Sequence, residues 1–223
     1  MISKLPRWVW SGAWALAFIA GMVNVIGLIG FEHQAITHLT GTTSLLGAAI
    51  GNLDVPAALH FLAAILSFVA GTAISGFLIQ DSTLKLGRRY GYVLFLESAL
   101  LFLAVPLLNR HHHLGSYFAA CACGLQNAMA TTYSGSVVRT THVSGMFTDL
   151  GIFIGHTLRG LKVDTRRLRL CVIIISGFLG GGIAGARAFG SLGYATLFIP
   201  ATLTGLAAFG YTFYQIRHSQ RQA

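Results

Sequence analysis

Long apolar runs alternate along the chain with short polar or basic stretches. Six of these runs supply the roughly 20 apolar residues that a helix needs to cross a hydrocarbon core about 30 Å thick. The runs are Trp8–Phe31, Pro56–Ile79, Tyr90–Leu108, Leu114–Thr132, Leu170–Phe189 and Leu192–Tyr214. The pattern therefore predicts six helices that cross a bilayer.

Two further segments, Thr40–Gly51 and Ser144–Leu158, are short and rich in small or hydroxyl residues. As helices they would be about 18 and about 22 Å long, which is too short to cross alone. Each follows a polar stretch, and irregular backbone at membrane depth must be buried in protein or line a cavity. Each segment is therefore predicted to be a broken crossing or a re-entrant half-helix.

The composition excludes a soluble protein. Charged residues make up 9% of the 223 residues and hydrophobic residues 54%, whereas soluble domains carry about 25% charged residues. Cys121, Cys123 and Cys171 all fall inside apolar runs, which favours packing over a disulfide or metal role. The fold class predicted is an all-α polytopic membrane protein.

The net charge of +9 gives the orientation of the helices. Its Lys and Arg residues lie between apolar runs, so nucleic-acid binding is not expected. If all eight segments crossed, ten of the fifteen basic residues would lie inside. If the two short segments re-enter, only Arg110 and Arg187 lie outside. The inside set is then Lys4, Arg7, Lys85, Arg88, Arg89, Arg139, Arg159, Lys162, Arg166, Arg167, Arg169, Arg217 and Arg221. The positive-inside rule favours six crossings, two re-entrant helices and both termini in the cytoplasm.

Four features of residues 1–112 return in the same order in residues 113–223. The pairs are Gly21-Met-Val-Asn24 with Gly124-Leu-Gln-Asn127, His38-Leu-Thr40-Gly41 with His142-Val-Ser144-Gly145, Gly71–Gly76 with Gly180–Gly185, and Gly91-Tyr92 with Gly193-Tyr194. Their offsets are 103, 104, 109 and 102 residues. Because each half holds three crossings, an odd number, the two membrane repeats are predicted to have inverted topology within one membrane domain.

Two signatures of this chain resemble those of the YoaK family of bacterial integral membrane proteins. The first runs from Gly21-Met-Val-Asn24 to His38-Leu-Thr40-Gly41, and the second runs from Gly124-Leu-Gln-Asn127 to Thr140-Thr-His-Val-Ser-Gly145. The resemblance covers nearly the whole chain. It implies a multi-pass protein of the bacterial plasma (inner) membrane and supplies no substrate, because the family is one of unknown function. Family members commonly carry Asp at the position of Asn24 and Asn at that of Thr42, so a family-wide carboxylate role does not transfer here.

Polar side chains within the apolar runs are the candidates for a substrate or translocation site, because such groups are costly in lipid. Asn24 and Asn127 occupy equivalent points of the two halves, and each either binds a polar solute or clamps the broken backbone of its own repeat. His38 and His142 precede the short helices and either contact a solute, carry a proton or anchor their loops. Thr40 and Ser144 are predicted N-caps. Paired helix N-termini favour a neutral polar or anionic solute.

Glu97, near the middle of its run, is the best candidate for proton or solute coupling. His60, Asp149 and His156 are secondary candidates, with Asp149 and His156 on one face of the second short helix. Asp149 is alternatively expected to pair with Arg139 or Arg159. Glu32 and His33 are expected at the outer mouth.

No cofactor or metal is predicted. His111-His112-His113 has no Cys or carboxylate nearby in the sequence, which favours an exposed loop. Gly180-Gly181-Gly182 follows no strand and precedes no Lys-Ser/Thr pair, so it is expected to pack helices together rather than bind phosphate.

These patterns favour a transporter or channel-like permease for a small neutral polar or anionic solute, with its site between the repeats. Two alternatives stay open: an intramembrane enzyme, and a non-transporting scaffold or partner protein. No nucleophile motif supports an enzyme, so none is expected. The lipid bilayer is the expected environment, and the glycine-rich faces suit either internal packing or a homo-oligomer.

Overall fold

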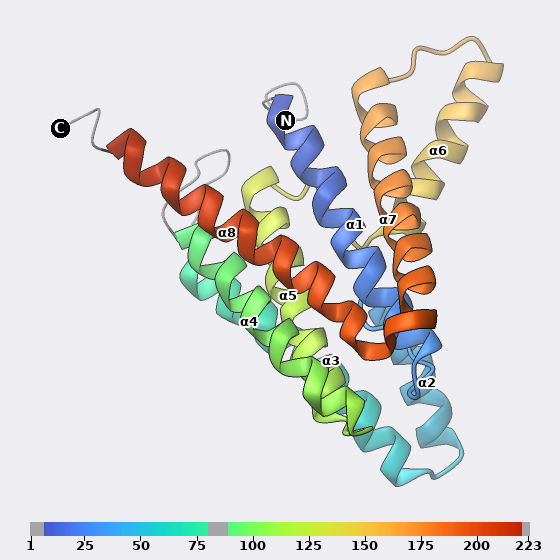
Figure 1. The fold of residues 1–223 in the computed structure, drawn as a ribbon. Helices are drawn as coiled ribbons and strands as arrows, with labels where there is room; N and C mark the ends of the chain where they lie inside the picture. The colour runs from blue at the N-terminus through green and yellow to red at the C-terminus, as the bar shows by residue number, and fades with distance from the viewer. Residues whose placement is uncertain (1–6, 80–88, 220–223) are drawn as a thin grey trace.

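The computed structural model describes residues 7–79 and 89–219, which form eight α-helices and one 3-10 helix (Figure 1). The helices are α1 (Arg7–Ile29), α2 (Leu39–Gly51), α3 (Val55–Leu78), α4 (Arg89–Asn109), α5 (Leu114–Ser134), α6 (Val143–Leu158), α7 (Thr165–Leu192), η2 (Gly193–Leu197) and α8 (Phe198–Ser219). The six long predicted runs correspond to α1, α3, α4, α5, α7 and α8, and the two short ones to α2 and α6. The basic residues Lys4, Lys85, Arg88 and Arg221 lie outside the described residues.

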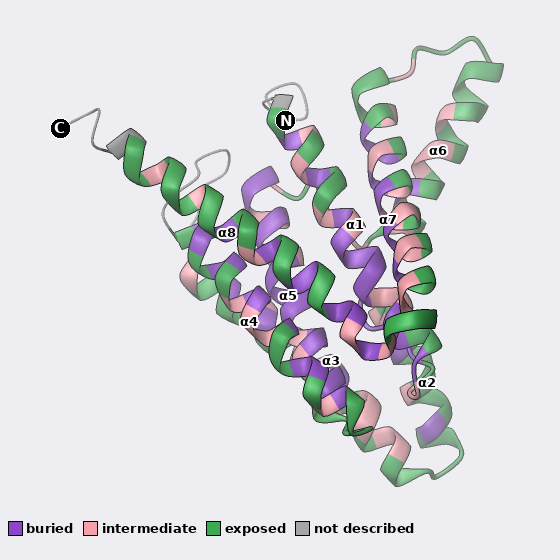
Figure 2. Cartoon of the chain, in the orientation of Figure 1, coloured by how far each residue is buried: buried purple, intermediate pink, exposed green. Residues whose placement is uncertain are grey.

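Four helical stretches are long and apolar enough to cross a membrane: Trp8–Ile29, Val55–Leu78, Arg89–Asn109 and Thr165–Arg217, the last comprising α7, η2 and α8. These stretches and the helical structure of the described residues confirm the prediction of an all-α membrane protein. Helix α5 is the one long helix that is not among these four stretches, because its many Ala, Gly and polar residues lower its mean hydropathy. It packs against both α3 and α4 and is largely buried, so its neighbours are protein side chains rather than lipid (Figure 2).

Aspartate caps start the two helices that follow the short segments. Asp54 accepts a hydrogen bond from Ala57 N at the start of α3 (3.1 Å). Asp164 accepts from Arg166 N (3.0 Å) and Arg167 N (3.2 Å) at the start of α7. Such caps satisfy backbone N–H groups that have no partner within the helix. The two caps lie 110 residues apart in the sequence.

Glycines bring helices of the two halves into main-chain contact. A Cβ at Gly21 or Gly181 would collide with the main chain at Phe178 or Phe18, respectively, which joins α1 to α7. Helices α3 and α5 meet in the same way, with Gly71 against Cys121 and Gly124 against Phe68. The counterpart of Gly71 in these contacts is therefore Gly181, at an offset of 110. The expected match with Gly180 is wrong by one residue, because three consecutive glycines left the register undetermined.

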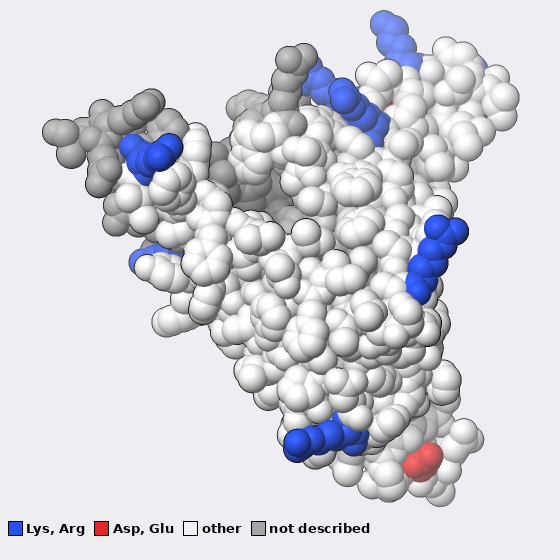
Figure 3. Space-filling view, in the orientation of Figure 1, with Lys and Arg blue, Asp and Glu red and all other residues white. Residues whose placement is uncertain are grey.

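Helices α2 and α6 lie at the edge of the bundle, where α2 packs on α3 and α6 on α7. Their outer faces are exposed (Figure 2). Exposed apolar side chains also cover much of α3 and α8, including Phe77, Leu66, Leu206 and Phe209. Figure 3 shows most Lys and Arg side chains of the visible face toward the ends of the molecule, with a broad uncharged surface between them. Such a surface suits a bilayer core.

Candidate functional site

A polar segment that we call the first break connects α1 to α2, and the equivalent segment between α5 and α6 is the second break. Asn24 on α1 holds the first break in place. Its Oδ1 atom accepts hydrogen bonds from Thr37 N (3.0 Å) and Thr37 Oγ1 (2.8 Å). The Gln34 amide donates to Thr42 Oγ1 (3.1 Å), and Gln34, Thr37 and Thr42 are all buried. Of the two roles expected for Asn24, the geometry therefore matches the backbone clamp.

The second break, between α5 and α6, uses Gln126 where the first uses Asn24. Thr140, the counterpart of Thr37, donates from Oγ1 to Gln126 Oε1 (3.4 Å). Asn127 makes no such clamp, and its Oδ1 atom is buried with no hydrogen-bond partner among the described residues. Sequence reasoning missed Gln126 and Thr140, although both lie inside the repeated signatures. The polarity of both residues was the available signal.

Glu97 on α4 lies behind this break. Its Oε1 accepts a hydrogen bond from Gln126 Nε2 (3.0 Å), whereas its Oε2 has no hydrogen-bond partner among the described residues. The side chains of Glu97, Gln126 and Thr140 are 2%, 2% and 0% exposed. The three residues form a buried polar chain from the middle of the bundle to the backbone of the break. A partly satisfied chain of this kind is costly, and it is most often retained at functional sites.

The repeated His-x-x-Gly motif has a packing explanation. His38 and His142 are the N-cap residues of α2 and α6, so the prediction that Thr40 and Ser144 are the N-caps is wrong. A Cβ at Gly145 would lie 2.6 Å from His142 Nδ1, and one at Gly41 would lie 3.1 Å from His38 Nδ1. Each imidazole ring thus lies over the first turn of its short helix, where a larger residue would displace it.

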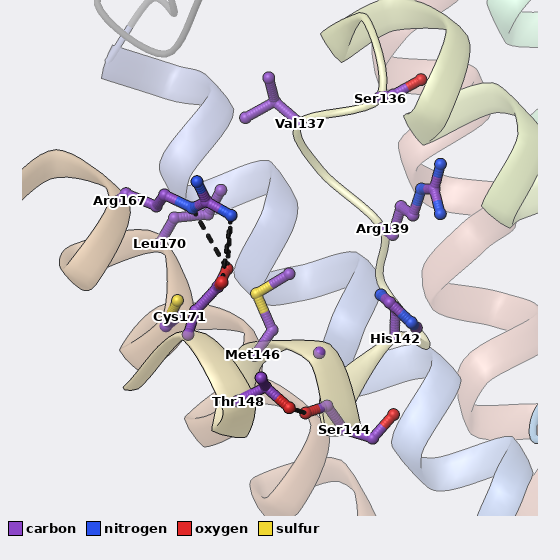
Figure 4. A pocket seen from close by; sticks show the side chains of 12 residues that line it. Ser136, Val137, Arg139, His142, Ser144, Met146, Thr148, Arg167, Leu170 and Cys171 are labelled. Atoms are coloured by element: carbon purple, nitrogen blue, oxygen red, sulfur yellow. Dashed lines mark hydrogen bonds and ion pairs between the residues drawn. The ribbon is translucent and has the colours of Figure 1, made fainter. Parts of the chain in front are cut away.

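A cavity of about 630 Å³ opens beside the second break (Figure 4). Arg139, His142 and Ser144 line it on the side of the break, while Arg167 and Cys171 on α7 line the facing wall. Arg139 is exposed, and its guanidinium has no hydrogen bond or ion pair within the described ranges. Figure 4 shows Arg139 and His142 on the connecting segment, across the cavity from Arg167. This arrangement presents cationic and hydroxyl groups to an open space.

Asp149, also on the cavity wall, pairs with a residue that the sequence did not indicate. Arg167 Nη2 donates to Asp149 Oδ1 (3.1 Å) and Oδ2 (3.0 Å), and Arg167 Nε donates to Oδ2 (3.2 Å). The expected partners, Arg139 and Arg159, are therefore wrong. The Asp149 carboxylate is satisfied by α7, which leaves Arg139 as the cation that faces the cavity without an acidic partner.

The remaining candidates do not meet at this cavity. Asn24 and His38 lie at the first break, and His156 is exposed in the last turn of α6. His60 lies in another cluster, with Glu32 and His113. Of the predicted set, the structure brings His142, Ser144 and Asp149 together at the cavity, with Glu97 connected to the break through Gln126 and Thr140.

Helices of this length, apolar surface and buried polar breaks define a multi-pass helical membrane protein. Residues 12–210 match the family model DUF1275, described as a protein of unknown function. The chain belongs to the DUF1275 family, which corresponds to the YoaK-like membrane proteins, so the resemblance noted from its motifs is confirmed. The comparisons with curated proteins and with solved structures gave no significant match.

Proposed function

We propose that this protein is a permease for a small solute, with its site at the second polar break. The observation that carries the proposal is the difference between two equivalent breaks. The first is closed by the Asn24–Thr37 clamp, whereas the second opens to the 630 Å³ cavity. In inverted-repeat transporters, alternating access arises when one repeat or bundle rocks or gates against the other around a fixed site.

The proposed topology is six crossings by α1, α3, α4, α5, α7 and α8, with α2 and α6 as short re-entrant helices. The hydrogen bonds of Thr37 to Asn24 support it, because the chain must turn back alongside α1 before α2 begins. The first turn of α1 and the last turn of α8 lie on the same side of the bundle (Figure 1). We place that side, which carries the basic α6–α7 connection, in the cytoplasm of a bacterial plasma membrane.

Two inverted repeats, residues 1–112 and 113–223, are part of the same proposal. The reciprocal glycine contacts support it, since α1 meets α7 as α5 meets α3. Figure 1 also shows α1 and α5 running in opposite directions. In addition, α2 and α6 each carry two glycines four residues apart with open space around them, Gly47 with Gly51 and Gly151 with Gly155. These open faces suit a homo-oligomer.

One equivalent position supports an anionic or neutral polar solute. In the first half it is Ile36, which is 7% exposed and packs against Gly27. In the second half, 103 residues later, it is Arg139, which faces the cavity. His142 and Ser144 add polar groups near the N-terminus of α6, whose partial positive charge favours an anion. Glu97, reached through Thr140 and Gln126, is the proposed coupling group.

Uptake into proteoliposomes by the purified protein tests this proposal, with small carboxylates, inorganic anions and neutral polar solutes as the panel. Arg139→Gln is expected to reduce uptake of the active solute at least about 10-fold, the effect of losing about 1.4 kcal/mol of binding. Arg159→Gln, at the far end of α6, is the matched control and should leave uptake unchanged. Absence of flux across the whole panel, or equal uptake by both variants, would refute the proposal.

A non-transporting partner protein is the second candidate, because the centre near Asn24 and Glu97 is packed and neither residue lines the 630 Å³ cavity. It predicts that no solute crosses and that a second protein binds the edge helices. We assign no enzymatic reaction to the chain. Solute flux that depends on Arg139 separates the two candidates.

A further inference from the structure

Three metal-ligating side chains from distant parts of the chain meet at the end of the bundle away from the termini. Glu32 follows α1, His60 lies in the second turn of α3, and His113 precedes α5. Their ligand atoms all lie within 4.8 Å of one another. The histidine tract is exposed, as the sequence favours, but the fold brings Glu32 from 81 residues earlier in the chain to lie 2.9 Å from His113 Nδ1.

We propose that Glu32, His60 and His113 bind a divalent transition-metal ion of the Zn²⁺ type. Zn²⁺ binds His nitrogen and carboxylate oxygen at about 2.0–2.2 Å, which places neighbouring ligand atoms about 3.3–3.6 Å apart at tetrahedral angles. His60 Nε2 lies 3.4 Å from Glu32 Oε2, and His113 Nδ1 lies 2.9 Å from Glu32 Oε1. Small shifts of these side chains therefore produce the required geometry.

Gln34 supplies a candidate for the fourth position. Its Oε1 atom lies 3.2 Å from His60 Nε2. Its amide nitrogen donates to Thr42 Oγ1 (3.1 Å), and this bond turns the amide oxygen toward His60. Either this oxygen or a water molecule completes four-coordination, because three protein ligands plus one exchangeable ligand is a common zinc arrangement.

The side chains around the cluster hold its ligands in position. The other ring nitrogen of His60, Nδ1, lies 2.9 Å from Tyr117 Oη, and this contact orients the ring with Nε2 toward Glu32. The Phe31 N–H group donates to Tyr194 Oη (2.6 Å), which anchors the backbone next to Glu32. The backbone carbonyl of His113 accepts from Ser116 N and Tyr117 N at the start of α5. The cluster is thus built on the ends of three packed helices.

Charge and access also suit a cation. The Glu32 carboxyl group lies between two imidazole rings, and its side chain is only 6% exposed. The His113 side chain is 57% exposed, which gives an ion a route from the aqueous phase. A bound ion would join α1, α3 and α5 at this end of the bundle.

This inference does not depend on the permease proposal, because the cluster and the cavity are lined by different residues. The test is calorimetric titration of the full-length, tag-free protein in detergent with ZnCl₂, followed by absorption spectroscopy with Co²⁺. The wild type should bind one ion per chain. Glu32→Gln and His113→Gln should each weaken binding at least about 10-fold. Loss of a residue that only supports a metal ligand already weakens metal binding by about this factor, so loss of a ligand should cost at least as much.

His112→Gln is the matched control, because it removes a histidine next to His113 that lies outside the cluster. It should bind Zn²⁺ as the wild type does. His113→Cys should retain the ion and give Co²⁺ a new thiolate charge-transfer band, a signal that a merely structural role would not produce. Lack of binding by the folded wild type, an equal loss with His112→Gln, or absence of the new band in folded His113→Cys protein would overturn the proposal.

Discussion

Gly181→Ala is expected to destabilise the protein more than the same change at the adjacent Gly182. A Cβ at position 181 would occupy the space of the Phe18 main chain on α1, including its carbonyl oxygen. Main-chain atoms cannot rotate away as a side chain can, so α1 and α7 must move apart over part of their interface. Position 182 has nothing within 4 Å of the added atom.

The size of the effect follows from these two surroundings. Overpacking a well-packed interior costs about 1–3 kcal/mol, and the main-chain collision at Gly181 places it at the upper end. Alanine gains up to about 1 kcal/mol over glycine within a helix, and Gly182→Ala has no collision to offset this gain. The two variants should therefore differ by about 3 kcal/mol in their free energy of unfolding.

Reversible unfolding by SDS in mixed micelles, followed by helix content, measures this difference. Gly71→Ala, which meets the Cys121 main chain, should repeat the loss, and Gly76→Ala, with nothing within 4 Å, should repeat the control. The reasoning is refuted if Gly181→Ala unfolds at the same SDS fraction as Gly182→Ala. A loss at Gly181 without one at Gly71 would show that the two helix pairs are not equivalent.

Three further predictions concern the breaks and the cavity. Asn24→Ala should lower the free energy of unfolding by about 1–3 kcal/mol in the same SDS titration, because Thr37 N loses its hydrogen-bond acceptor. Asn24→Asp keeps an acceptor oxygen and should lose less stability. Equal losses in the two variants would contradict the clamp. Asp149→Asn should cost less than about 1 kcal/mol, since Arg167 is 53% exposed; a larger coupling in a double-mutant cycle with Arg167→Gln would disprove this weak contribution. Cysteine labelling with a membrane-impermeant maleimide tests the topology in a protein whose native cysteines are replaced by alanine. Ser144→Cys should react in inside-out vesicles, and Thr40→Cys should react in right-side-out vesicles. Labelling of both cysteines from the same side would exclude the inverted topology.

The sequence predicted the helical segments well because bilayer thickness imposes a length that apolar runs reveal. It was less informative wherever packing between helices decides the outcome. Leu114–Thr132 was correctly expected to be helical, yet α5 is too polar to rank among the four apolar stretches, because it is enclosed by protein. The repeat register was misread at Gly180 because glycines carry no side chain that distinguishes one position from the next.

Contacts within the candidate site were harder to predict, for a geometric reason. Gln126 and Asn127 are adjacent, and neighbouring helical residues point about 100° apart. Only packing determines which of them meets Glu97 and Thr140, and the structure selects Gln126. The Glu32–His60–His113 cluster could not be predicted from the histidine tract, because no carboxylate lies near the tract in the sequence. Packing of the helices brings Glu32 next to His113.

The proposed repeat also helps to distinguish residues that are explained by packing from residues that are candidates for the proposed site. His38 and His142 occur in both halves and do the same work in each, with a ring over the glycine three residues later. A feature that both halves share in this way is explained by packing. Arg139 is different, because its counterpart Ile36 is buried while Arg139 faces a cavity. If the two halves are equivalent, as we propose, candidates for the proposed solute site are best sought where equivalent positions carry different chemistry, and Arg139 is one such position that lines the cavity.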